Sequence, residues 1–188
     1  ESHKDKRYRE LLLARVETES ANTLSRLRDR SEAETAQVIE HLKESISLKE
    51  AHGDLEGLAA SYGIMGNFYL WQAKNPEAAL DSYSKDLDII DRAGSRNDRP
   101  SLLNRMGMAL YAMATSGDTI VATNLSEAMD LTQQALRSAR QLEQENNALF
   151  AAGALVRYGC EQQLPLAEWE AGLETVEQQN IVSKCAGF

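Results

Sequence analysis

One spacing constrains the fold of this chain more than any other feature, because it occurs twice. Gly53 and Gly94 are each followed, thirteen residues later, by the glycine of a Met-Gly pair, at Gly66 and Gly107. Glycine favours the left-handed conformation that ends a helix, whereas a glycine inside a helix costs about 1 kcal/mol relative to alanine. The first glycine of each set therefore predicts a helix end. The second predicts a point where a neighbouring helix approaches closely.

A second amphipathic helix is expected downstream of each Met-Gly pair. In both stretches small and large apolar residues alternate, as interlocking helices require. These residues are Ala79, Leu80, Tyr83 and Leu87 in the first stretch and Ala128, Met129, Ala135 and Leu136 in the second. The chain is thus predicted to consist of successive helix pairs.

The start of one helix is marked by a short motif. Ser31 and Glu34 have the spacing of a capping box, in which the hydroxyl and the carboxylate each satisfy a free amide at a helix N-terminus. The helix that follows carries its apolar residues on one face, at Val38, Ile39, Leu42 and Ile46. We expect it to run from residue 31 to Gly53.

Composition supports helices and excludes some partners. Three prolines in 188 residues and a 6% aromatic content favour helices over strands. The formal net charge of −9 disfavours nucleic acid as a partner, because proteins that bind the phosphate backbone carry a basic surface. No apolar run approaches the roughly 20 residues of a membrane-spanning helix, so no membrane span is expected.

Residues 1–30 differ from the rest of the chain. They hold eight basic and six acidic side chains, a net charge of +2, against −11 for the other 158 residues. An apolar stripe recurs through this segment at helical spacing, at Tyr8, Leu12, Val16, Thr23 and Leu27. We predict a leading helix over residues 5–29 that attaches to the following helices through this stripe and caps them. The alternative is a helix that docks on a partner.

The repeated pattern resembles the tetratricopeptide repeat, in the longer form of about forty residues found in kinesin light chains. The resemblance rests on residues 53–69, with the Met-Gly pair, and on the run from Asn75 to Tyr83. It is good over residues 31–95 and fair over 96–143, where the loop from Thr115 to Asn124 is longer than the pattern allows. It is poor over 144–180.

In the last repeat the position equivalent to Met-Gly is occupied either by Ala152-Gly153 or by Leu155-Val156, and Pro165 is expected to open the final helix. The resemblance implies an all-α solenoid of about eight helices, in which antiparallel pairs stack into a right-handed arc. The array is placed at residues 31–180, and residues 181–188 are assigned to a C-terminal tail.

The resemblance also implies a site. In such arrays the first helix of each pair lines a concave groove that holds a peptide or helix of a partner protein. Asn, Arg and aromatic side chains suit that role, because they can bind a peptide backbone, a carboxylate or an apolar side chain. The predicted groove residues are Asn67, Trp71, Asn104, Arg105, Met108, Tyr111 and, more weakly, Arg157. Alternatively, Trp71, Met108 and Tyr111 are core residues.

One subclass of the family holds the C-terminal carboxylate of chaperones in a clamp of basic and asparagine side chains. Asn67 matches one clamp position, but Gly63 stands where the preceding basic residue is required. The sequence therefore does not favour a chaperone-tail binder.

Catalytic and metal-binding patterns are absent from the sequence. It has no HExxH, CxxC, GxSxG or glycine-rich phosphate loop, and its three histidines do not form a ligand set. We therefore expect no enzyme, no cofactor and no metal. Two cysteines are too few for a disulfide scaffold, which favours an intracellular location. Cys160 is interpreted as a small buried residue and Cys185 as an exposed one.

The sequence thus predicts a non-enzymatic scaffold or adaptor that binds a peptide or helix of a partner protein. Two alternatives remain open at this point. One is a structural subunit built into a larger multi-protein complex, and the other is a regulatory arm of a longer signalling protein.

Overall fold

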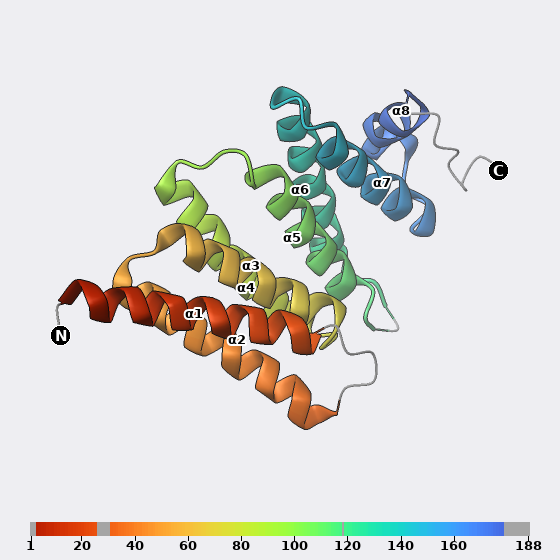
Figure 1. Ribbon diagram of the computed structural model, residues 1–188. Coiled ribbons are helices and arrows are strands. Elements are labelled where there is room, and N and C mark those ends of the chain that lie inside the picture. The colour runs from red at the N-terminus through yellow and green to blue at the C-terminus, as the bar shows by residue number, and fades with distance from the viewer. Residues whose placement is uncertain (1–2, 26–30, 118, 179–188) are drawn as a thin grey trace. The chain divides into compact units, whose positions relative to one another are not determined.

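The structure is a computed structural model that describes residues 3–25, 31–117 and 119–178. These residues form eight α-helices and one short 3-10 helix, and no strand occurs among them (Figure 1). The predicted all-α class is confirmed, whereas the predicted tail at 181–188 lies outside the described residues. The helices are α1 (His3–Ser25), α2 (Glu32–His52), α3 (Leu55–Trp71), α4 (Pro76–Ala93), α5 (Arg99–Ala114), α6 (Ala122–Gln141), α7 (Glu145–Glu161) and α8 (Glu170–Gln178).

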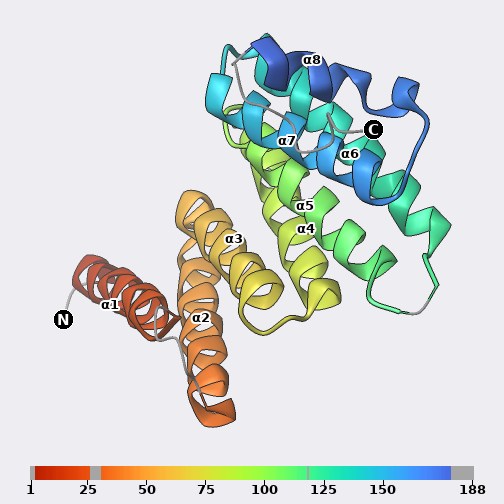
Figure 2. The same cartoon turned by 90° about the vertical axis from the view of Figure 1, so that its right-hand side faces the viewer.

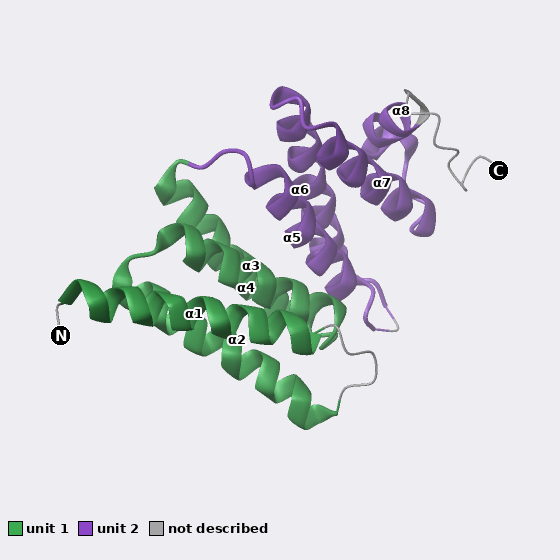
Figure 3. Cartoon of the chain, in the orientation of Figure 1, with its two compact units in different colours: residues 1–94 green, residues 95–188 purple. Residues whose placement is uncertain are grey.

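The chain divides into two compact units, residues 1–94 and 95–188 (Figure 3). Each unit stacks two helix hairpins, α1–α2 on α3–α4 in unit 1 and α5–α6 on α7–α8 in unit 2. The second helix of one hairpin packs on the first helix of the next, as α2 does on α3 and α6 on α7. The first helices also touch, as α1–α3 and α5–α7.

The predicted helix ends are confirmed. The Ser31 hydroxyl accepts the Glu34 backbone N–H at 3.2 Å, and the Glu34 carboxylate accepts the Ser31 backbone N–H at 2.8 Å, so the capping box is complete. Gly53 and Gly94 adopt φ values of 65° and 69° after α2 and α4. Side chains rarely tolerate this conformation, which explains glycine there.

Three other helix ends use the same conformation without glycine. Lys74, Glu143 and Gln163 have φ values of 52°, 55° and 52°, and they follow α3, α6 and α7 respectively. All three side chains are exposed. The left-handed conformation costs a residue other than glycine roughly 1 kcal/mol of conformational free energy. The packing of the surrounding helices must offset this cost at the three helix ends.

The close approaches predicted at the two Met-Gly pairs are confirmed. A Cβ added at Gly66 would collide with the ring of Tyr83, which α4 buries against α3. A Cβ at Gly107 would collide with the Thr132 hydroxyl and lie 3.0 Å from the Ala128 backbone oxygen, both on α6. The hairpins α3–α4 and α5–α6 therefore each close on a glycine of their first helix.

The face through which α1 packs was predicted wrongly. Tyr8, Leu12 and Val16 are exposed, while Ala14 and Ala21 are fully buried against the rest of unit 1. Alanine lets two helix backbones approach closely, and the interface uses that proximity for polar contacts, while Leu24 packs against the core of unit 1. Leu27 and residues 26–29 of the predicted helix lie outside the described residues.

Those polar contacts surround a buried lysine where α1, α2 and α3 meet. Lys49 is 4% exposed, and its Nζ donates to the Thr18 hydroxyl at 3.0 Å and the Ser61 hydroxyl at 2.7 Å. The Ser45 hydroxyl donates to the Ala14 backbone oxygen at 2.8 Å. Burial lowers the pKa of Lys49, partly opposed by the charge of Asp54. The apolar core of unit 1 adjoins this cluster, with Ala21, Val38, Leu42, Ile46, Leu58, Met65, Phe68 and Ile89.

Two segments of unit 2 differ from the predicted boundaries, namely the loop predicted from Thr115 to Asn124 and the final helix predicted to open at Pro165. Ile120 and Val121 are exposed loop residues, and α6 begins after them at Ala122. Pro165 does not open the final helix directly, because a 3-10 turn at Leu166–Glu168 comes between Pro165 and α8.

Candidate functional site

The two predicted groove residues of unit 1 have different surroundings. Asn67 is half-buried in α3, and its side-chain oxygen accepts a hydrogen bond from the Tyr83 hydroxyl at 2.9 Å. Trp71 is exposed at the end of α3. Gly63, at the clamp position that lacks a basic residue, faces the carboxylate of Asp86. Asn67 thus helps to join α3 to α4, and Trp71 is the exposed member of this pair.

The predicted stripe on α5 is mostly covered. Asn104 and Tyr111 are buried, and Arg105 and Met108 are half-buried. The Asn104 side-chain oxygen is buried without a hydrogen-bond partner among the described residues. These four α5 residues therefore do not form a solvent-exposed polar surface.

Tyr111 and Arg157 come together from different helices. The rings of Tyr111 on α5 and Tyr158 on α7 stack with centroids 4.0 Å apart and planes 14° from parallel. The Arg157 guanidinium carbon lies 5.5 Å from the Tyr111 ring centroid and 5.3 Å from that of Tyr158. A guanidinium over aromatic rings is stabilised by the negative faces of the rings. The cluster therefore holds an exposed cation in a defined place.

Hydrogen bonds fix the same cluster to the end of α7. The Tyr111 hydroxyl donates to a Glu161 carboxylate oxygen at 2.5 Å, and the Gln162 side-chain amide donates to that hydroxyl at 2.8 Å. Burial and the bond to Glu161 raise the pKa of Tyr111. Burial raises the pKa of Tyr158 to about 12, although the Arg157 charge opposes the shift. Both tyrosines therefore stay neutral at physiological pH.

Arg157 belongs to an exposed face of α7 that the sequence analysis missed. Phe150, Gly153, Arg157 and Glu161 follow one another at spacings of three, four and four residues, and all four are exposed. Phe150 is 71% exposed. We call these four residues the α7 face. Their helical spacing was the available signal, but without the structure it cannot be distinguished from a buried stripe.

Gly153 is unlike most glycines inside helices of this chain. A Cβ added at Gly159 would collide with the Trp169 ring, and one added at Gly172 would lie 2.8 Å from the Ala152 backbone oxygen. A Cβ at Gly153 would have no atom within 4 Å. Packing within the chain therefore gives no reason for glycine at this position. Of the two alternatives in the last repeat, Gly153 is not the residue on which the neighbouring helix closes.

Unit 1 contains a groove with its own aromatic and charged lining. The groove lies among α2, α3 and α4 and has a volume of about 350 Å³. The Tyr62 hydroxyl donates to Glu50 at 3.2 Å, and Lys85 donates to Asp81 at 2.8 Å. Lys85 also lies 5.7 Å from the Tyr62 ring centroid. Glu50, Asp81 and Lys85 thus already have partners within this groove, so they have less to offer a ligand than the α7 face.

No three His, Cys, Asp or Glu side chains among the described residues are grouped to hold a metal ion. None of the helices in the described ranges combines the length and apolar character needed to cross a membrane. Cys160 is half-buried and disulfide-bonded, not a buried free thiol, and Cys185 lies outside the described residues. In comparisons with known proteins, no family model and no curated protein matches the chain significantly.

Proposed function

We propose that this chain is a non-enzymatic scaffold or adaptor of the tetratricopeptide-repeat kind, and that the α7 face binds a segment of a partner protein. The observation that carries the proposal is the exposed face itself. An aromatic side chain, a bare stretch of helix backbone and an arginine follow one another along one side of α7, at Phe150, Gly153 and Arg157.

The arginine is suited to bind a carboxylate. Its guanidinium rests over Tyr111 and Tyr158, which limits the conformations that the free side chain samples. Binding then loses less side-chain entropy, and the planar group can pair a carboxylate through two hydrogen bonds. The partner segment should therefore carry Asp or Glu.

Phe150 and Gly153 supply the apolar part of the surface. Burying an exposed Phe side chain contributes roughly 2 kcal/mol, and the missing side chain at Gly153 lets a partner backbone or apolar group approach the helix. Because the two positions are about one turn apart, one apolar side chain of the partner can contact both. The expected motif combines an apolar residue and an acidic residue.

The hairpin stacking supports the assignment to this helix. In tetratricopeptide arrays the first helix of each pair lines the binding groove, and α5 and α7 are the first helices of the two pairs in unit 2. They contact each other and share the tyrosine stack. We therefore expect the partner segment to bind along the side of unit 2 where the Arg157 guanidinium lies over the Tyr111 ring.

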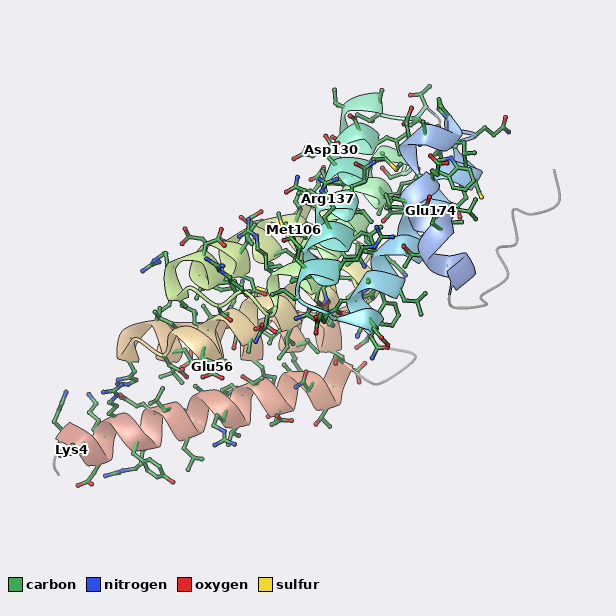
Figure 4. The ribbon with its side chains drawn as sticks, turned by 90° about the horizontal axis from the view of Figure 1, so that it is seen from above. Lys4, Glu56, Met106, Asp130, Arg137 and Glu174 are labelled. Atoms are coloured by element: carbon green, nitrogen blue, oxygen red, sulfur yellow. The ribbon has the colours of Figure 1, made fainter. Side chains whose placement is uncertain are left out.

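A displayed library of random peptides, selected on the immobilised 188-residue chain, tests the proposal. Peptides that pair an acidic with an apolar residue should be enriched. Phe150→Ala and Arg157→Ala should each weaken their binding by about tenfold or more, as for central interface residues. Arg137→Ala is the matched control, because Arg137 is an exposed arginine of the same unit on α6 (Figure 4).

Two results would contradict the proposal. One is selection that enriches no peptide above background. The other is enriched peptides that bind Phe150→Ala and Arg157→Ala as tightly as the unsubstituted chain. Helix content measured by circular dichroism must be the same in all variants, so that lost binding reports the surface and not the fold.

A further inference from the structure

The helix α1 has two faces with different chemistry. Its inner face is joined to α2 by Ala14 and Ala21 and by two pairs of side chains on its flank. A Glu10 carboxylate oxygen lies 2.7 Å from His52 Nε2, and a Glu17 carboxylate oxygen lies 2.5 Å from His41 Nδ1. These contacts fix which side of α1 faces away from α2. In Figure 2, α1 forms one edge of unit 1.

The outer face is apolar. Tyr8, Leu12, Leu13 and Val16 are 70%, 47%, 44% and 52% exposed, although they lie within nine residues of one another. A shallow hollow of about 710 Å³ borders Leu12 and Val16, and it is lined by α1 residues from Leu12 to Leu24 together with His41 of α2. Contiguous exposed apolar surface of this kind usually marks an interaction site. We call these residues, with Arg9 and Glu19, the outer α1 face.

Four of the six residues of the outer α1 face are placed symmetrically about residue 14, whereas Tyr8 and Leu13 have Ser20 and Arg15 at the symmetric positions. Leu12 and Val16 lie two positions on either side of it, and Arg9 and Glu19 lie five positions on either side. If two copies of the helix packed antiparallel around this centre, Leu12 of one copy would lie opposite Val16 of the other. Arg9 would likewise lie opposite Glu19. Each contact would occur twice, as a two-fold axis requires.

Charge along α1 favours the same arrangement. Residues 3–15 contain five basic and two acidic side chains, a net charge of +3, whereas residues 16–25 contain two acidic and no basic side chains, a net charge of −2. Antiparallel packing sets the basic half of one helix against the acidic half of the other. Parallel packing would set like charges together, which is unfavourable.

We propose that the outer α1 face is the interface of a homodimer, in which α1 of a second copy packs antiparallel across Leu12 and Val16. The occupant is a second copy because one surface supplies both members of each pair, apolar with apolar and Arg9 with Glu19. The interface belongs to unit 1 and uses none of the residues of the α7 face.

The apolar centre is tested by sedimentation equilibrium of the whole 188-residue chain over a range of concentrations. The unsubstituted chain should form a dimer. Leu12→Glu should raise the dimer dissociation constant by about 100-fold or more, because the substitution is present twice in one interface. Glu44→Arg, an exposed change on α2, is the control and should leave the dimer unchanged.

The antiparallel register is tested by charge reversal. Arg9→Glu and Glu19→Arg should each weaken the dimer by about three- to tenfold, since each sets like charges at both ends of the interface. An equimolar mixture of the two variants should restore dimerisation. In the mixed pair, position 9 of each copy faces an opposite charge at position 19 of the other.

Several results would overturn the proposal. One is a chain that stays monomeric up to about 0.5 mM, where even weak self-association is detectable. Another is a dimer that Leu12→Glu leaves intact, which would place the interface elsewhere. A third is a mixture that dimerises no better than the separate variants, which would exclude the antiparallel register. A monomer that binds a different protein through Leu12 would identify another occupant and equally refute the homodimer.

Discussion

The interiors of the two units differ although their helices are arranged alike. In unit 1 the contact of α1, α2 and α3 is built around Lys49 and the hydroxyls of Thr18 and Ser61. In unit 2 the contact of α5 and α7 is built around the stacked rings of Tyr111 and Tyr158. Stacked helix hairpins therefore accept either a charged polar cluster or an aromatic stack at a comparable place.

The difference has an energetic consequence. Lys49 is buried with hydroxyl partners and makes no ion pair with a carboxylate among the described residues, so its charge lacks full compensation. A buried charge that lacks a counter-ion carries a desolvation cost, which an apolar residue of similar volume would not carry. The aromatic stack contributes apolar burial and ring contacts instead. We therefore expect that an apolar substitution at the polar cluster can raise the stability of unit 1, whereas the aromatic stack of unit 2 offers no such gain.

Substitutions of the two Met-Gly glycines are expected to have the largest effect on stability. They test whether the helices of α3–α4 and α5–α6 approach each other equally closely. Gly66→Ala in unit 1 and Gly107→Ala in unit 2 should each lower the free energy of unfolding by about 2 kcal/mol, because the added methyl group meets fixed atoms of the facing helix. Urea unfolding followed by circular dichroism measures this.

Gly153→Ala is the matched control, because its methyl group would meet nothing within 4 Å. It should raise the free energy of unfolding by up to about 1 kcal/mol through helix propensity. Destabilisation by Gly153→Ala, or tolerance of alanine at Gly66 and Gly107, would contradict the packing described for these helices.

Asn67 tests whether a predicted groove residue of unit 1 is structural. Asn67→Ala removes the acceptor of the Tyr83 hydroxyl and should lower the free energy of unfolding by about 1 kcal/mol. Tyr83→Phe should cost a similar amount, and the double variant should cost less than the sum of the two. Additive losses would show that this hydrogen bond does not join α3 to α4.

Lys49→Met tests the polar interior of unit 1. At pH 7 it should raise the free energy of unfolding by about 1 kcal/mol. Because burial lowers the folded-state pKa of Lys49 below 10.5, the unfolded chain binds more protons between these two values, and stability rises with pH across that window. The advantage of Lys49→Met should therefore shrink at alkaline pH. Urea titrations at several pH values measure this, and a constant difference would contradict it.

Tyr158→Phe tests the aromatic interior of unit 2 and has the smallest expected effect at neutral pH, less than about 0.5 kcal/mol. The folded state keeps the Tyr158 proton up to about pH 12, whereas an unperturbed tyrosine loses it near 10.0. Stability from this group is therefore lost as pH rises between those values, opposite in sign to the effect of Lys49. Ultraviolet absorbance of the phenolate, compared between the two proteins, should show the late titration. A midpoint near 10 would contradict it.

Local signals predicted helix ends and pairs, but not which face of a helix is buried. The capping box at Ser31 and the close approach at Gly66 depend on residues near each other in sequence or on the special geometry of glycine. The inner face of α1 depends on what α2 presents, and Ser45 and Lys49 favour close contact through Ala14. Large apolar residues therefore predicted the wrong face.

The candidate site could be predicted only in part, for a similar reason. Tyr111 and Arg157 were both predicted as groove residues from the resemblance, yet their contact requires the packing of α5 on α7, which no local pattern encodes. Tyr158 was missed because a tyrosine next to an arginine in sequence gives no sign that it stacks on another helix. Gly153 becomes informative only when its surroundings are known to be empty.

Most of the extensive contacts in both units join helices that are consecutive in the chain, and this bears on how the protein folds. Apart from α1 with α3 and α5 with α7, the helix pairs in extensive contact are direct neighbours in sequence. Chains rich in such local contacts close short loops first and fold in microseconds to milliseconds. A hairpin such as α1–α2 can thus form before α8 has been synthesised, so we expect folding to proceed from the N-terminus during translation.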